Sequence, residues 1–120
     1  MSEHQEQVRL VSWAVENERW LPELKMLFAI PNGGKRKNGW WEVAEGLKRG
    51  VPDLFLAAQK HHRGVSWGGM FIEMKFGKNK PTKDQKEWLS ELEEANYYCV
   101  VCHSWEEAKK AILFYLGQPG

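Results

Sequence analysis

Two apolar segments that carry acidic residues constrain this chain more than any other feature. Residues 51–54 read Val-Pro-Asp-Leu, and residues 71–75 read Phe-Ile-Glu-Met-Lys. Because side chains in a strand alternate between its two faces, Glu73 and Lys75 would point to one side while their apolar neighbours point into the core. If the two segments pair as neighbouring strands, the carboxylates of Asp53 and Glu73 meet one ammonium group at an edge of the sheet.

This combination of groups suits the hydrolysis of a phosphodiester. Hard cations such as Mg²⁺ take oxygen ligands, and one or two carboxylates plus a substrate phosphate usually hold them. A bound ion stabilises charge on phosphoryl oxygens and activates water near neutral pH, and an adjacent lysine steadies the developing charge. Each segment also has an ordinary explanation, because Glu-x-Lys occurs on solvated strands and Pro-Asp occurs in turns.

The size and composition of the chain narrow its class. With 120 residues, 42% hydrophobic and 28% charged, we expect one soluble globular domain spanning 1–120. No apolar run approaches the roughly 20 residues that cross a membrane, and the polar N-terminal segment does not read as a signal peptide. The net charge of +1 means that nucleic-acid binding would need local basic patches. Two cysteines fit free thiols in a reducing, cytoplasmic compartment.

Helical and strand patterns alternate along the chain. Ser2 with Gln5, and Thr82 with Gln85, read as capping boxes that begin helices. The connection 59–69 is Gly-rich and basic, which predicts a long hairpin loop. In chain order we expect a helix over 2–18, a strand over 26–30, a turn over 31–34, a basic loop over 35–39, a helix over 41–49, strands over 53–58 and 70–76, a helix from 82, a strand over 97–102 and a helix from 104.

On this element order the chain resembles the PD-(D/E)xK nuclease superfamily. The closer resemblance is to the VRR-NUC (virus-type replication-repair nuclease) family, especially its small stand-alone members from phages and bacteria. It implies an α/β, restriction-endonuclease-like core, in which helices flank a four-stranded mixed sheet in the order αβαββαβα. The residues that carry it are Ser2-Glu3 with Gln7, Pro31-Asn32-Gly33-Gly34, Gly50-Val51-Pro52-Asp53-Leu54, Ile72-Glu73-Met74-Lys75, Gln85 and Trp88-Leu89.

The same resemblance implies the members of the site. Asp53, Glu73 and the main-chain carbonyl of Met74 would bind Mg²⁺ or Mn²⁺, and Lys75 would be the catalytic lysine. Gln85 would support the site from the following helix, although its other role is the capping box, and the two roles are compatible. DNA is the implied substrate, and stand-alone members are expected to act as homodimers on branched DNA such as four-way junctions.

An acid from the first helix would complete the metal site. The predicted apolar stripe of that helix contains Val8, Leu10, Val11, Ala14 and Val15, and it centres near Val11. Glu3 lies nearer to this centre than Glu6 does, so we select Glu3. The alternative is that both acids simply favour a helix N-terminus.

Basic residues flank the predicted site on both sides and suggest DNA contacts. The turn before the basic loop has glycines that let backbone amides approach a phosphate, although it could equally just reverse the chain. Basic side chains near aromatic ones suit a nucleic-acid backbone, whereas the alternative is a solvated charged loop. The candidate DNA-binding residues are Asn32, Gly33, Gly34, Lys35, Arg36 and Lys37 on one side and Lys78, Lys80 and Lys83 on the other.

The sequence therefore predicts a metal-dependent DNA endonuclease that reads DNA shape rather than bases. A two-fold dimer would supply the two cuts that a four-way junction needs. A non-catalytic DNA-binding module with the same fold is one rival, and a phosphodiesterase acting on RNA or small nucleotides is another. The apolar surface for a dimer would come from the tryptophan surplus, namely Trp13, Trp20, Trp40, Trp41 and Trp67.

Overall fold

A four-stranded mixed sheet forms the centre of the protein, as the sequence predicts. The structure is a computed structural model, and it describes residues 2–31 and 44–118. β1 pairs antiparallel with β2, β2 pairs antiparallel with β5, and β5 pairs parallel with β6. In spatial order the strands are β1 (Leu27–Ala29), β2 (Leu54–Leu56), β5 (Met70–Met74) and β6 (Tyr98–Cys102).

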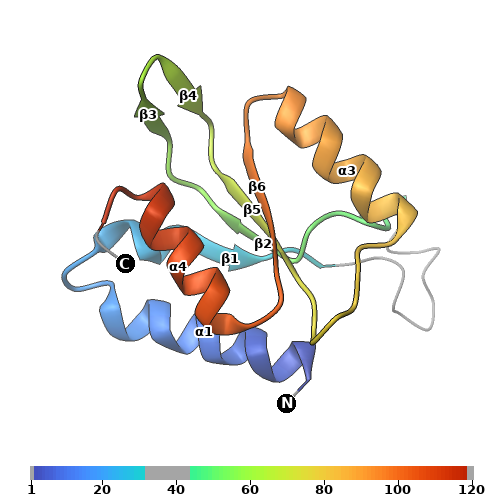
Figure 1. The fold of residues 1–120 in the computed structure, drawn as a ribbon, viewed down its shortest axis with the longest axis horizontal. Coiled ribbons are helices and arrows are strands. Elements are labelled where there is room, and N and C mark those ends of the chain that lie inside the picture. Colours follow the sequence, from blue (N-terminus) through green and yellow to red (C-terminus); the bar gives the residue numbers. More distant parts are fainter. Residues whose placement is uncertain (1, 32–43, 119–120) are drawn as a thin grey trace.

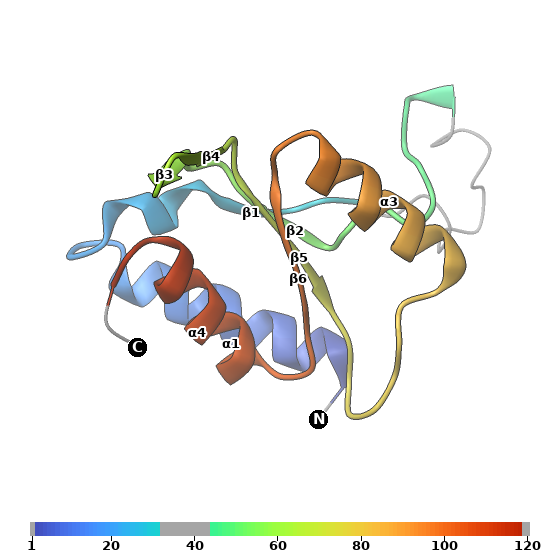
Figure 2. The same cartoon turned by 45° about the horizontal axis from the view of Figure 1, so that its top comes forward.

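Helices cover both faces of this sheet (Figures 1 and 2). α1 (Glu3–Asn17) and α4 (Trp105–Tyr115) lie side by side on one face, and α3 (Lys83–Glu94) lies on the other. The core sits under α1 and α4, whereas α3 has no buried residue. The face of the sheet that α3 covers is thus only half-buried. The fully buried side chains of the core include Leu10, Leu54, Leu56, Met70, Ile72 and Ile112.

The inner face of α1 differs from the predicted stripe. The capping box of Ser2 and Gln5 is present, but Val8 and Val15 are 49% and 60% exposed. The buried residues are instead Glu6, Leu10, Trp13 and Ala14. Leu10 and Ala14 were placed correctly. The predicted stripe was otherwise wrong because it counted aliphatic residues alone, whereas the large Trp13 side chain and the acid Glu6 lie on the inward face.

Glu6 is buried because its carboxylate joins two helices. Its Oε1 accepts a hydrogen bond of 2.8 Å from the backbone N–H of Trp105, at the start of α4. The Ser104 hydroxyl accepts from the N–H of Glu107 at the same end, so side chains occupy the first turn of α4. The expectation that Glu6 points away from the core was therefore wrong.

Replacing Glu6 with Ala is expected to destabilise the protein by about 2 kcal/mol, because it removes a charge-assisted hydrogen bond and leaves a partly buried N–H unpaired. Chemical denaturation measures the loss. Glu16→Ala is the matched control, because this acid is exposed on the same helix. Equal stabilities for the two variants would contradict the role of Glu6.

Residues 59–69 form a small β-ribbon rather than the predicted loop. β3 (Lys60–His62) and β4 (Val65–Trp67) pair antiparallel and project away from the main sheet (Figure 1). Arg63 and Gly64 connect them with positive φ values of 50° and 81°. A two-residue turn with both φ values positive matches the right-handed twist of a ribbon, so the Arg-Gly pair was the overlooked signal.

Other boundaries also differ from the prediction. Met26 ends a 3₁₀ helix, η1 (Pro22–Met26), so β1 is shorter than the expected strand 26–30. The first residues of the expected helix 41–49 lie outside the described part of the chain. Among residues 44–49 only Ala44 is helical, and Gly46 follows with a φ of 102°, so the helix does not reach Arg49. Most of the predicted turn 31–34 and the whole basic loop 35–39 lie outside the described residues.

The strand 97–102 and the helices beginning at Thr82 and Ser104 are confirmed, with Thr82 and Gln85 forming the predicted capping box. Within residues 2–31 and 44–118, no helix combines the length and apolar character needed to cross a bilayer.

Candidate active site at the end of the central strands

Asp53 and Glu73 lie opposite each other on neighbouring strands. Leu54 pairs with Ile72 in the antiparallel register of β2 and β5, so Asp53, one residue earlier, falls opposite Glu73. Residues directly opposite share a face of the sheet, which brings the two carboxyl groups together. The Asp53 carboxylate is further held by its Oδ2, which accepts a hydrogen bond of 2.7 Å from the backbone N–H of Met74.

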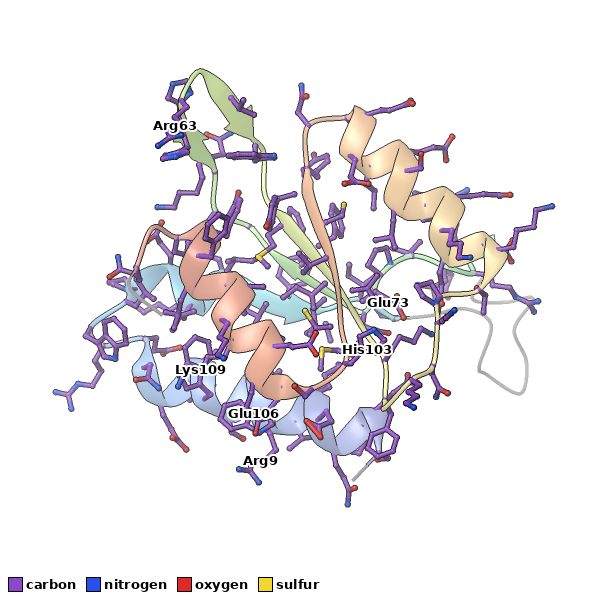
Figure 3. The ribbon with its side chains drawn as sticks, viewed as in Figure 1. Arg9, Arg63, Glu73, His103, Glu106 and Lys109 are labelled. Carbon is purple, nitrogen blue, oxygen red and sulfur yellow. The ribbon has the colours of Figure 1, made fainter. Side chains whose placement is uncertain are left out.

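Glu73 and Lys75 form a buried ion pair on the same side of β5. Their residues are 2% and 7% exposed, and the Lys75 Nζ lies 3.4 Å from the Glu73 Oε2. Figure 3 places Glu73 near the end of the sheet that leads toward α3. Three ionisable side chains therefore meet where little water can screen them.

The electrostatics of this cluster disfavour a charged Glu73. Burial and the neighbouring Asp53 carboxylate raise the pKa of Glu73 to about 8, although the Lys75 ammonium acts in the opposite direction. The raised pKa of Glu73 beside a second carboxylate means that the site lacks enough positive charge to stabilise both carboxylates. Perturbed pKa values of this kind mark candidate functional sites.

The donor set fits a hard divalent cation. Two carboxylates converge with one ammonium, and oxygen ligands are those that Mg²⁺ and Mn²⁺ prefer. Within the described ranges, no group of three or more Asp, Glu, His or Cys side chains is arranged to hold a metal ion. The remaining coordination positions would then fall to a main-chain oxygen, water and a substrate phosphate, which is a common arrangement for Mg²⁺.

The other candidate ligand and support residues are not joined to this cluster. Glu3 is half-buried in the first turn of α1, where it belongs to no metal-binding group of described side chains. Since the Oε1 of Glu6 is engaged by Trp105, Glu3 remains the first-helix acid to propose. The Gln85 Oε1 accepts a hydrogen bond of 2.8 Å from the N–H of Thr82, so its capping role is present and its catalytic role stays a prediction.

The candidate DNA-binding residues divide into two groups. Lys78 and Lys80 are exposed on the connection between β5 and α3, and Lys83 is exposed in the first turn of α3. Their positions are compatible with contact to a nucleic-acid backbone beside the site. Residues 32–37, which form the other group, lie outside the described residues.

The segment before Asp53 is fastened to α3 by contacts that the sequence did not reveal. The indole N–H of Trp88 donates to the carbonyl of Arg49, over 3.1 Å. Gly50 has a φ of 90°, and a Cβ at this position would lie 2.8 Å from the Cβ of Asp84. Only glycine allows this close approach, which fixes the path of the chain into Pro52 and Asp53.

Comparisons of the sequence and of the fold with known proteins both find the VRR-NUC domain. The sequence profile of the VRR-NUC domain matches residues 1–106. A solved structure described as a VRR_NUC domain protein superposes with a TM-score of 0.81 at 22% identity, covering 98% of this chain and 89% of that chain. At this identity the structural likeness shows the shared fold. No match was found among curated proteins.

Proposed function

Because the chain belongs to the VRR-NUC domain family, a family of nuclease-type domains, we propose that it is a metal-dependent DNA endonuclease. The observation that carries the proposal is the buried convergence of Asp53, Glu73 and Lys75 at the end of β2 and β5. A structural ion pair would need one acid for one base, whereas this site has an additional carboxylate that raises the pKa of Glu73.

In the proposed mechanism, four groups would hold Mg²⁺ or Mn²⁺, namely the carboxylates of Asp53, Glu73 and Glu3 and the main-chain carbonyl of Met74. The bound ion would supply Lewis-acid stabilisation of the phosphate and lower the pKa of water. The Met74 N–H holds Asp53 Oδ2, which orients this carboxylate. Burial of Glu73 keeps bulk water from competing for its oxygens.

Lys75 has a distinct role in this proposal. Its ammonium lies 3.4 Å from the Glu73 Oε2, close enough to orient the attacking water or to neutralise charge that develops on the phosphate. Gln85 would support the site from α3. The exposed Lys78, Lys80 and Lys83 would bind the flanking DNA backbone without reading its sequence.

We propose branched DNA, such as a four-way junction, as the preferred substrate and a homodimer as the active form. Trp13 is only 8% exposed, so it belongs to the core and not to the interface expected of it. Exposed apolar side chains elsewhere, including Trp20 (58%) and Phe114 (73%), offer surface for self-association. Sedimentation of the active protein tests this, and a monomer that makes paired cuts would overturn the dimer.

A cleavage panel tests the proposed function. Wild-type protein with Mn²⁺ is expected to cut a labelled four-way DNA junction faster than duplex DNA, and RNA least, with no cutting in EDTA. Asp53→Asn should reduce junction cleavage by about 10³-fold, because it removes one of the charged oxygen ligands. DNA binding without any cleavage would support the non-catalytic alternative, and preferential cutting of RNA would support the other rival.

A further inference from the structure

An imidazole that the proposed mechanism does not use stands beside Lys75. The parallel register pairs Met74 with Cys102, and the N–H of Lys75 donates to the Cys102 carbonyl over 2.8 Å. His103 follows Cys102 directly, just beyond the end of β6, as Lys75 lies just beyond the end of β5. Figure 3 shows His103 and Glu73 in the same region, where β5 and β6 end.

The alternation along β6 directs His103 toward the side of the sheet that carries Lys75. Cys102 is buried in the core under α1 and α4, and Glu107 of α4 helps raise its pKa. Cys99, three residues earlier, faces the other way, since Glu93 of α3 helps raise its pKa. His103 follows the last residue of β6, and continuation of this alternation by one residue places it on the α3 side, with Glu73 and Lys75.

The two nitrogens of this ring have different surroundings. Among the described residues, Nδ1 of His103 is the one buried side-chain nitrogen or oxygen without a hydrogen-bond partner. A buried N–H without an acceptor costs more than an unfilled lone pair, because the proton loses its water and gains nothing. Between the two tautomers of the imidazole, this difference favours the one that carries its proton on Nε2, so the ring offers a donor there.

Nearby backbone donors already have partners. The N–H of His103 donates to Glu107 Oε1, and the N–H of Trp105 donates to Glu6 Oε1. The N–H of Glu107 donates to the Ser104 hydroxyl. The first turn of α4 thus uses these three N–H groups internally, so they do not compete with the imidazole for a ligand.

We propose that His103 is a substrate-binding residue, whose Nε2–H donates to a non-bridging phosphate oxygen of the DNA strand held at Lys75. The proposal rests on the proposed nuclease function and adds a residue to it. Phosphate oxygens are the acceptors that a DNA backbone presents, and they receive most contacts that position a protein on DNA. A donor next to the lysine would fix the register of the strand relative to Asp53 and Glu73.

Three substitutions of His103 distinguish the roles of its two ring nitrogens. In His103→Gln the side-chain amide nitrogen reaches the position of Nε2, in His103→Asn it reaches that of Nδ1, and His103→Leu removes both. In junction cleavage with Mn²⁺, the Gln variant is expected to keep kcat/KM within about threefold of wild type. The Asn and Leu variants should lose about tenfold, mainly through a higher KM, as for the loss of a hydrogen bond to a charged group.

His62→Leu is the matched control, because this exposed histidine lies on the separate β3–β4 ribbon, and its kcat/KM should not change. Thermal melting of each variant detects a purely structural role. Unchanged kinetics in the Leu variant, rescue by Asn rather than Gln, or equal losses in all three variants with lowered melting temperatures would each overturn the proposal. An inactive wild-type protein would instead overturn the nuclease function on which it rests.

Discussion

Replacing Glu73 with Gln is expected to abolish cleavage, with a loss of kcat of roughly 10³-fold or more. The substitution keeps the shape of a side chain that is 2% exposed, so we expect the fold to be unchanged. It removes the charge that would hold a divalent ion beside Asp53, and an amide is a far poorer ligand for such an ion. Single-turnover cleavage of a four-way junction measures the loss.

The control variant is Glu91→Gln, which makes the same chemical change at an exposed position of α3. We expect that control to cut at the wild-type rate. Junction affinity, measured by fluorescence anisotropy, should remain within a few-fold of wild type in the Glu73 variant. A Glu73→Gln protein that still cuts at more than a tenth of the wild-type rate would exclude Glu73 as a metal ligand.

The same substitution is expected to raise the melting temperature of the metal-free protein by roughly 5 °C or more at pH 8 to 9. Burial and the Asp53 carboxylate raise the pKa of Glu73 from 4.5 to about 8. Gln imitates the protonated acid, which is the form that this buried position favours in the absence of metal. The ionised Glu73 carboxylate, which would bind the ion, is thus expected to lower the stability of the metal-free protein.

The effect should depend on pH with a defined sign. Below about pH 4.5 Glu73 is protonated in both the folded and the unfolded chain, so Glu and Gln should be similar there. As the pH rises from about 4.5 to about 8, the unfolded chain releases this proton while the folded protein retains it. The wild-type protein therefore loses stability over this interval, and the advantage of the Gln variant grows and then levels off.

Melting curves from pH 5 to 9 in EDTA measure this difference, and Glu91→Gln again provides the control. Addition of Mg²⁺ or Mn²⁺ at pH 8 should raise the melting temperature of wild type much more than that of the Glu73 variant, since a ligand of the folded state stabilises it. A difference between the two proteins that is the same at every pH would contradict the raised pKa of Glu73.

The local features of the fold were readable in the sequence. The capping residues at Ser2, Thr82 and Ser104 begin helices because their hydroxyls satisfy N–H groups within the same turn. The apolar segments that become β2 and β5 were recognised from residues next to each other in the chain. Asp53 and Glu73 could be predicted as partners because both lie at the ends of these segments, although their pairing depended on an assumed neighbourhood.

Apart from the Arg63-Gly64 turn and some element boundaries, the features that failed or were missing depend on contacts between distant segments. Trp13 and Glu6 decide which face of α1 is inward, and Glu6 does so through Trp105 of α4. Gly50 is required by its contact with Asp84, and His103 gains its proposed role through the register of β6 beside β5.

Sequence alone therefore determined most of the element types, the capping residues and the acidic and basic groups available for chemistry, because these follow from interactions a few residues apart. The tertiary structure decided which of those groups meet, how deeply Glu73 and Lys75 are buried, and which nitrogen of His103 lacks a partner. Burial and strand register come from the packing of whole elements, and no short segment of the chain contains that information.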